Sequence, residues 1–145
     1  ADMLASEDIM LESFYMSNMS PQHPSFNRGD WRKLENRVRE WALLHDSLVV
    51  VTGPHFEETV ERIGENEVAV PSHYFKVVLD ISAQGGYHAI AFLMPNKKFD
   101  DPLNAFAMSV DELEAQTGYD FFAAQPQTVI EQVEKQYQAN AWPLN

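Results

Sequence analysis

The apolar positions between residues 30 and 44 recur with the period of an α-helix. At about 100° per residue, one face of such a helix collects Trp31, Leu34, Val38, Trp41 and Ala42. We therefore expect a helix from about Asp30 to Leu44, with this face packed against the core. Asn27 should then lie in a loop directly before the helix.

Three apolar runs have the composition of β-strands. Residues 48–52 form a continuous β-branched run that ends at Gly53-Pro54, which predicts a central strand covered on both faces. The runs at 74–81 and 87–94 are separated by a short glycine-containing segment, a pattern typical of an antiparallel hairpin. Residues 56–70 are acidic and should be irregular, with a turn at Gly64-Glu65-Asn66.

Capping signals predict three further short helices. A serine followed by two acidic residues opens one over residues 6–14. Capping boxes at 109–112 and 128–131 open two more, which should end at Gly118 and near Gln138. These patterns alone predict either an α/β or an α+β domain.

Length and composition define the general class of protein. The chain has 145 residues, so residues 1–145 should form a single domain, and 45% of them are hydrophobic, which is enough for a sizeable core. No apolar run approaches the ~20 residues that a membrane-spanning helix needs. The chain has no cysteine, which excludes disulfides and thiolate metal sites. A net charge of −12 argues against general electrostatic attraction to nucleic acid.

The basic residues nevertheless gather in one segment, Phe14–Arg39. Five of the ten lysines and arginines lie there: Arg28, Arg32, Lys33, Arg37 and Arg39. A polar loop that leads into a basic helix start favours an anionic ligand, because free N–H groups and the helix dipole point to it. On the helical wheel, the edge of the apolar face carries Arg28, Arg32, Glu35 and Arg39. The alternative is an ordinary surface helix of mixed charge, which Lys33 and Arg37 fit.

Other chemical motifs are missing from the sequence. The five histidines show no ligand spacing such as a helical i, i+4 pair, which argues against a zinc site. His73 precedes a predicted strand, and we expect a hydrogen-bonded structural role for it. There is no glycine-rich phosphate loop and no G-x-S-x-G turn. Residue patterns alone thus give one anion site and no catalytic base.

Several motifs in order resemble those of the DNA/RNA non-specific endonucleases. The matching segments are Ser17-Asn18-Met19-Ser20-Pro21-Gln22, Phe26-Asn27-Arg28-Gly29, Trp31-x-x-Leu34-Glu35, Val50–Pro54, Val70–Lys76, Ala91–Asn96, Asp111–Glu114 and Thr117–Phe122. The resemblance covers nearly the whole chain. It implies an α+β fold of the ββα-metal nuclease type, with a mostly antiparallel sheet and packed helices.

The same resemblance implies roles for particular residues. Asn27 matches the sole protein ligand of a hydrated Mg²⁺, for which Mn²⁺ can substitute. Glu35 matches the acidic residue that holds metal-bound waters, and Arg39 the arginine that stabilises charge on the phosphate. Asn18 and Arg28 match positions near the substrate. Mg²⁺ keeps most of its waters, so one amide ligand and an outer carboxylate form a reasonable site.

One departure concerns the catalytic base. The family's D-R-G-H motif, whose histidine activates water, is absent, and the chain begins at Ala1-Asp2-Met3, which resembles a sequence that follows that motif. We expect this chain to be the C-terminal portion of an endonuclease domain, lacking the N-terminal strands and the catalytic-histidine segment. An N-terminal fragment carrying that histidine is then an expected partner, and the isolated chain should be inactive.

The expected function is Mg²⁺-dependent hydrolysis of phosphodiester bonds in DNA and RNA without sequence preference. Expected partners are DNA and RNA, with a homodimer as one form of assembly and no membrane. Family resemblance favours a secreted or periplasmic location. The alternative is a non-catalytic fragment of the same fold that binds nucleic acid or an inhibitor protein.

Overall fold

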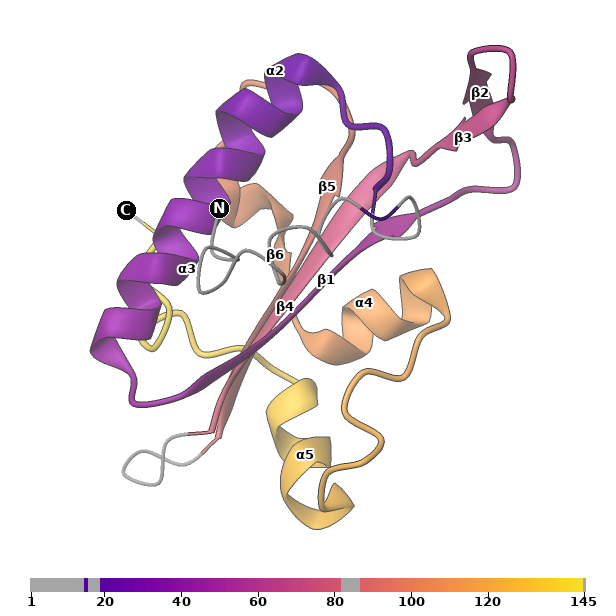
Figure 1. Ribbon diagram of the computed structural model, residues 1–145. Helices are drawn as coiled ribbons and strands as arrows, with labels where there is room; N and C mark the ends of the chain where they lie inside the picture. The colour runs from indigo at the N-terminus through magenta and orange to yellow at the C-terminus, as the bar shows by residue number, and fades with distance from the viewer. Residues whose placement is uncertain (1–14, 16–18, 82–86, 145) are drawn as a thin grey trace.

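An antiparallel sheet forms the middle layer of the molecule. A computed structural model of the chain describes residues 15, 19–81 and 87–144. In these ranges the sheet has four strands in the order β1-β4-β5-β6, with helices on both faces (Figure 1). The strands are β1 Leu48–His55, β4 His73–Asp80, β5 His88–Pro95 and β6 Ala107–Met108. The predicted α+β class is therefore confirmed, whereas the helix expected over 6–14 lies outside the described residues.

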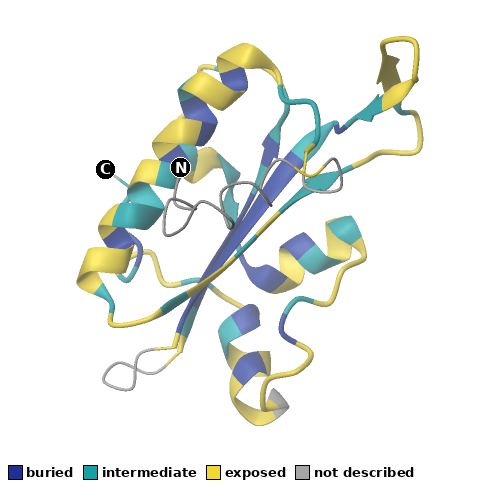
Figure 2. Cartoon of the chain, in the orientation of Figure 1, coloured by how far each residue is buried: buried dark blue, intermediate teal, exposed yellow. Residues whose placement is uncertain are grey.

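Strand β4 is the central strand, and both of its faces are buried (Figure 2). Phe75, Val77 and Leu79 pack toward one helical layer, and Tyr74 and Val78 toward the other. The first layer consists of α4 (Val110–Thr117) and α5 (Gln127–Glu134), and the second contains a long helix that precedes β1. This alternation follows the period of two of a β-strand. The β4–β5 hairpin was predicted correctly.

The long helix begins earlier than predicted and changes its geometry along its length. It consists of α2 (Pro24–Phe26), a π-helical turn η2 (Asn27–Trp31) and α3 (Arg32–Leu44), which follow one another without a break. Asn27 is thus part of the helix, and its predicted place in a preceding loop is wrong. The proline explains the difference: at the first helical position Pro24 has a suitable φ and its missing N–H is not needed.

The predicted apolar face of this helix is largely confirmed. Trp31, Leu34 and Trp41 are buried, and Val38 packs against the same core. Ala42 is exposed, against the prediction, together with the two leucines that follow it. The last turn of α3 therefore lies beyond the layer that covers the rest of the helix.

Two predictions about the strands were wrong. Strand β1 is an edge strand of the described sheet rather than a central one, and Val49 and Val50 are exposed. The two inner strands are β4, which pairs with β1 and β5, and β5, which pairs with β4 and β6; of these, β4 is the more completely buried. The segment predicted to be irregular holds a small hairpin, β2 (Glu61–Ile63) and β3 (Val68–Val70), around the predicted turn at Gly64.

The two C-terminal helices differ in how well their caps were predicted. Ser109 and Glu112 form the expected capping box of α4, and Gly118 ends that helix with φ of 73°. Helix α5 begins directly after Pro126 and ends at Glu134, so the cap expected at residue 128 is wrong. The Pro126 carbonyl accepts the first helical hydrogen bonds instead. None of the helices in the described ranges is long and apolar enough to cross a membrane.

Glu134 is a buried acid at the end of α5, with 8% of its surface exposed. Burial, followed by the negative charges of Glu114, Asp111, Asp120 and Glu131, raises the pKa of its carboxyl group from 4.5 to about 7. The folded chain therefore holds a proton on Glu134 at pH values where the unfolded chain has lost it.

We predict that the free energy of unfolding falls as pH rises from about 4.5 to about 7, because the folded state binds more protons in this window. Glu134→Gln removes this titration. The free energy of unfolding of the variant should exceed that of the parent by about 1–3 kcal/mol at pH 8 and should differ little at pH 4.5, since one pKa unit corresponds to ~1.4 kcal/mol. Urea unfolding at several pH values measures the difference. Exposed Glu65→Gln is the control, and parallel pH curves for parent and Glu134→Gln would contradict the prediction.

Candidate functional site

Three aromatic side chains fix the start of the long helix to the central strand. The ring centroid of Phe26 lies 5.3 Å from that of Trp31 and 5.8 Å from that of Tyr74 on β4. The Trp31 and Tyr74 rings are 5.8 Å apart, so the three form one cluster, which we call the aromatic anchor. Lys76 lies over the Trp31 ring, with Nζ 4.7 Å from the centroid, and donates a hydrogen bond to Thr52 Oγ1 (2.7 Å).

The π turn determines which residues share a side of this helix. Phe26 and Trp31 are five residues apart, and both are buried in the anchor. A π turn takes up roughly one residue more than the ~3.6 of an α-turn, so this spacing suits it. Glu35 follows Asn27 by eight residues, which would place them about 80° apart in a regular α-helix. With the π turn, eight residues make about two full turns, and the two side chains fall on the same side.

Arg39 continues this row one turn further along the helix. It follows Glu35 by four residues, and both side chains are half-buried, as expected for the edge of the apolar face. Arg28 and Arg32 are exposed, so the predicted place of these two arginines at the edge of the apolar face, where side chains are partly buried, is wrong.

The basic side chains on the helix differ in how their charges are balanced. Lys33 pairs with Asp30 (2.7 Å) and Arg37 with Glu40 (2.6 Å), each within one turn, as expected for an ordinary surface helix. Arg28 donates from Nε to the Pro24 carbonyl (3.4 Å), and Arg39 donates from Nη1 to Asn36 Oδ1 (2.8 Å). Arg28 is exposed, so its guanidinium group is accessible to an anionic ligand at the surface.

Gln22 is a residue of the site to which the sequence analysis gave no role. Its Oε1 accepts a hydrogen bond from the exposed Asn27 side-chain amide, Nδ2. This contact directs the other atom of the amide, Oδ1, away from Gln22 and makes it the group offered to a ligand. Gln22 belongs to the matching segment that starts at Ser17, so the motif pointed to it without showing its function. Asn18, the other amide expected here, lies outside the described residues.

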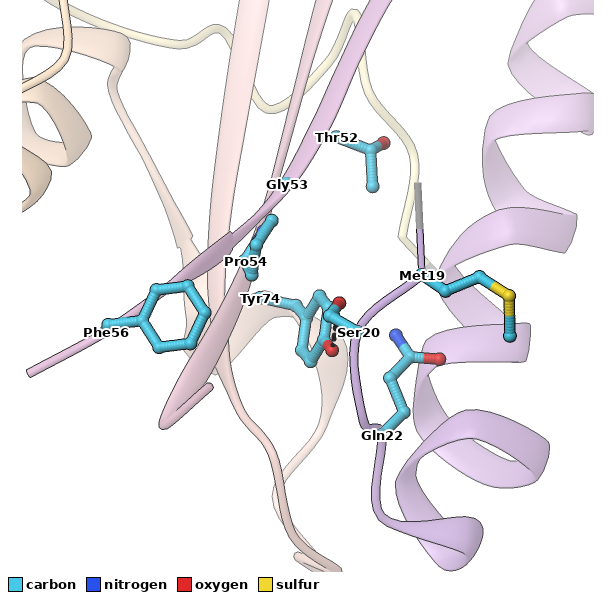
Figure 3. A pocket seen from close by; sticks show the side chains of 8 residues that line it. All are labelled: Met19, Ser20, Gln22, Thr52, Gly53, Pro54, Phe56 and Tyr74. Atoms are coloured by element: carbon cyan, nitrogen blue, oxygen red, sulfur yellow. Dashed lines mark hydrogen bonds between the residues drawn. The ribbon is translucent and has the colours of Figure 1, made fainter. Parts of the chain in front are cut away.

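A cavity of about 540 Å³ lies between β1 and the segment that leads into the long helix (Figure 3). We call it the β1 cavity; it is lined by Met19, Ser20, Gln22, residues 52–54, Phe56 and Tyr74. The Tyr74 hydroxyl hydrogen-bonds Ser20 Oγ (2.6 Å) and donates to the Pro21 carbonyl (3.0 Å). Burial raises the pKa of Tyr74, and the hydrogen bond with Ser20 lowers it by a smaller amount. The hydroxyl therefore keeps its proton. Gln22 connects this cavity to Asn27.

Asn96 holds the segment before the helix in place. Its Nδ2 donates to the carbonyls of Pro21 (3.0 Å) and Pro71 (2.9 Å), and its Oδ1 accepts from the His23 backbone N–H (2.7 Å). One half-buried amide thus joins the end of β5 to the start of β4 and to the wall of the β1 cavity. The match over Ala91–Asn96 contained this residue, but its clamp-like role depends on contacts distant in the sequence.

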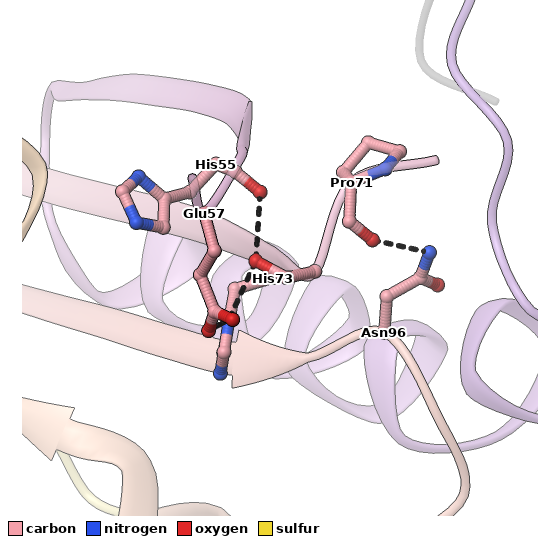
Figure 4. A network of polar contacts seen from close by, with 6 residues as sticks. His55, Glu57, Pro71, His73 and Asn96 are labelled. Atoms are coloured by element: carbon pink, nitrogen blue, oxygen red, sulfur yellow. Dashed lines mark hydrogen bonds and ion pairs between the residues drawn. The ribbon is translucent and has the colours of Figure 1, made fainter. Parts of the chain in front are cut away.

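His73 lies in a neighbouring polar network, close to Glu57, Ser72 and His55 (Figure 4). Its Nδ1 is 3.0 Å from Ser72 Oγ and 3.5 Å from Glu57 Oε1. Burial lowers the pKa of His73. The negative charge of Glu57 raises this pKa by less, and the charges of His55 and Lys97 lower it further. These contacts support the expected hydrogen-bonded role. Within the described part of the chain, no histidine side chain hydrogen-bonds Asn27 or Glu35; the one contact with a histidine is between backbone groups, from the Asn27 N–H to the His23 carbonyl (3.0 Å).

The donor atoms along the row suit a hard, hydrated cation. Asn27 offers a neutral amide oxygen at the surface, and Glu35 offers carboxylate oxygens from the same side of the helix. Within residues 15, 19–81 and 87–144 there is no group of three or more His, Asp or Glu side chains that could enclose a metal. Mg²⁺ retains several waters and binds through few protein ligands, so it fits this open donor set.

Comparisons with known proteins identify the class. A family model for the DNA/RNA non-specific endonucleases matches residues 1–128, and the chain belongs to this family. A solved structure of the EndoG/EndoGI complex, concerned with the mechanism of EndoG inhibition, contains a chain with a TM-score of 0.74 and 33% identity. The match covers 86% of this chain and 56% of that one. The fold is that of the ββα-metal nucleases.

Individual relatives agree with this family. Mitochondrial endonuclease G of Bos taurus is 34% identical over 125 residues (78% of this chain, 42% of the relative). Mitochondrial nuclease EXOG of Danio rerio is 36% identical over 142 residues (85% and 40%), and nuclease C1 of Cunninghamella echinulata var. echinulata is 35% identical over 133 residues (83% and 53%). The chain thus spans about half the length of these relatives or less. Two of the names are mitochondrial, so the expected secreted or periplasmic location stays a prediction.

We predict that, in a form of the protein that cleaves, Gln22→Ala raises the Mg²⁺ concentration needed for half-maximal cleavage by about 10–100-fold, as loss of a hydrogen bond to a metal ligand commonly does, if Asn27 is that ligand. The Asn27 amide would then rotate more freely. Plasmid cleavage as a function of Mg²⁺ concentration measures this effect. Gln116→Ala on α4 is the matched control, because Gln116 is an exposed glutamine remote from the long helix. Equal Mg²⁺ dependence in parent and Gln22→Ala would remove Gln22 from the site.

Proposed function

We propose that this chain forms the metal- and phosphate-binding part of a Mg²⁺-dependent endonuclease that hydrolyses phosphodiester bonds in DNA and RNA. The row of Asn27, Glu35 and Arg39 along one side of the long helix carries this proposal. Membership of the DNA/RNA non-specific endonuclease family supports the reaction class. The oxygen donors of the row support Mg²⁺ as the metal, with Mn²⁺ as a substitute.

Each residue of the row has a separate task. Asn27 binds the metal through Oδ1, because Gln22 occupies its Nδ2. Glu35 accepts hydrogen bonds from metal-bound waters and so orients them. Arg39 donates to the oxygens of the scissile phosphate, where negative charge increases during cleavage. Mg²⁺, when bound, supplies positive charge beside the phosphate and the leaving oxygen.

Low sequence preference follows from the kind of contact these residues make. Arg28 and Asn18, which match family positions near the substrate, would contact phosphate and sugar groups, which carry no direct sequence information. DNA and RNA share the phosphodiester group, so both can be substrates. Because the chain as a whole is negatively charged, binding of nucleic acid would depend on the basic residues gathered in the segment Phe14–Arg39.

A second candidate is a non-catalytic fragment that binds nucleic acid or an inhibitor protein. One observation favours it: in the described ranges no imidazole hydrogen-bonds the side chain of Asn27 or Glu35, and imidazole is the usual proton acceptor near neutral pH. An amide and a guanidinium cannot accept the proton of the attacking water. The first candidate predicts that nucleic acid is bound and cut. The second predicts that nucleic acid or an inhibitor protein is bound and that nothing is cut.

We predict that the protein containing this chain cuts plasmid DNA and RNA with Mg²⁺ or Mn²⁺ and stops when a chelator is added. The 145-residue chain alone should bind DNA with an affinity that falls as salt rises, but should not cut it. Gel assays and salt-dependent anisotropy measure the two properties. Chelator-resistant cutting would overturn the metal dependence, and salt-independent binding would overturn the phosphate contacts.

Arg39→Ala should lower kcat more than substrate affinity in the form of the protein that cleaves, by about 10²–10³-fold, as loss of a donor to developing charge does. Arg37→Ala is the matched control, because Arg37 is also an arginine of α3 but pairs with Glu40. Steady-state kinetics on a labelled oligonucleotide separate kcat from KM. A kcat of Arg39→Ala equal to that of Arg37→Ala would exclude Arg39 from the mechanism.

A further inference from the structure

The β1 cavity has the size and lining of a small-molecule site, and the roles assigned above leave it unused. We propose that it binds one nucleobase of the substrate strand, next to the scissile phosphate, with Phe56 as the stacking surface. This proposal rests on the proposed function, because the base must come from a strand held by the Asn27 row. A volume of about 540 Å³ lies within the range of ~300–1,000 Å³ typical of such pockets.

The cavity is held open by contacts that are independent of any ligand. The Tyr74 ring packs in the aromatic anchor, and its hydroxyl is fixed by Ser20 and Pro21. Asn96 fixes Pro21 and the residue after Gln22 from outside. A preformed wall of this kind lowers the ordering cost of binding.

The chemistry of the lining matches a base better than a phosphate. None of the lining side chains is charged, whereas the arginines that suit a phosphate lie on the adjoining helix. Phe56 is 41% exposed and stands at the β1 end of the cavity, while Gln22 stands on the side of the helix (Figure 3). An aromatic face and polar groups at the rim complement the flat faces and polar edges of a base.

Stacking also agrees with low sequence preference. Every base has a π-face, so an aromatic platform binds all of them with similar strength. A hydrogen bond sets the position of the base relative to the metal site. Gln22 lines the cavity and hydrogen-bonds Asn27, so a base in the cavity is adjacent to the candidate metal ligand. In duplex DNA the bases are already stacked, so single strands should use this subsite more readily.

The experiment measures binding without cleavage, in the presence of a chelator. A labelled single-stranded oligonucleotide is titrated with the parent and with Phe56→Ala, Phe56→Trp and Tyr87→Ala. A series of oligonucleotides, each lacking one base, is titrated in parallel. Tyr87 is a matched control, because it is 37% exposed and lines a different cavity beside α5. Thermal unfolding checks that all variants are folded.

We expect Phe56→Ala to bind the intact strand about tenfold more weakly and Phe56→Trp and Tyr87→Ala to bind it like the parent. One abasic position should weaken binding by the parent about tenfold and leave Phe56→Ala unaffected. Parent-like binding by Phe56→Ala, or an abasic effect of equal size in both proteins, would overturn the subsite. Because no cleavage is measured, failure of the subsite and failure of the nuclease proposal give different results.

Discussion

Packing of Phe26 against Trp31 and Tyr74 is the constraint on which the geometry of the site depends. The two residues on the helix are five positions apart, so both can reach the core only if the helix takes up an extra residue between them. The π turn is therefore a consequence of core packing. The same turn brings Asn27 into line with Glu35 and Arg39. Hydrophobic burial of one face of the helix thus sets the arrangement of the polar groups along the edge of that face.

The central strand β4 transmits this constraint to the rest of the site. Its residue Tyr74 is part of the aromatic anchor, forms a wall of the β1 cavity and bonds the segment before the helix. Because both faces of β4 are buried, small displacements of this strand would disturb two packed layers, which are close-packed and resist compression. The helix start and the cavity consequently share one rigid support.

The sequence predicted the features that depend on local pattern. Periodicity gave the apolar face of α3, strand patterns gave the β4–β5 hairpin, and the Ser109 box gave α4. The helix start at Pro24 was missed because a proline usually interrupts a helix, although the first helical turn tolerates it. The edge position of β1 was missed because strand order depends on distant pairing, which a run of valines does not encode.

The candidate site was predictable to a similar extent. Motif resemblance gave Asn27, Glu35 and Arg39, but the phase between Asn27 and Glu35 depends on the π turn. A regular helix of eight residues would have set them about 80° apart. The part played by Gln22 depends on a contact between side chains, and the part played by Asn96 on contacts across more than seventy positions. Such contacts require the fold before they can be described.

Separation of charge across the sheet makes the acidic composition of the chain compatible with the anionic substrate proposed for it. Helices α4 and α5 and the segment between them carry Asp111, Glu112, Glu114, Asp120, Glu131 and Glu134, while half of the basic residues lie on the long helix across the sheet (Figure 1). Screening in physiological salt limits an exposed charge to a reach of ~8 Å, less than the ~10–12 Å diameter of one helix. The acidic layer therefore opposes binding at the basic helix only weakly. On its own side the acidic layer repels polyanions, which favours approach of the proposed nucleic-acid substrate along the face that carries Asn27 and Arg39.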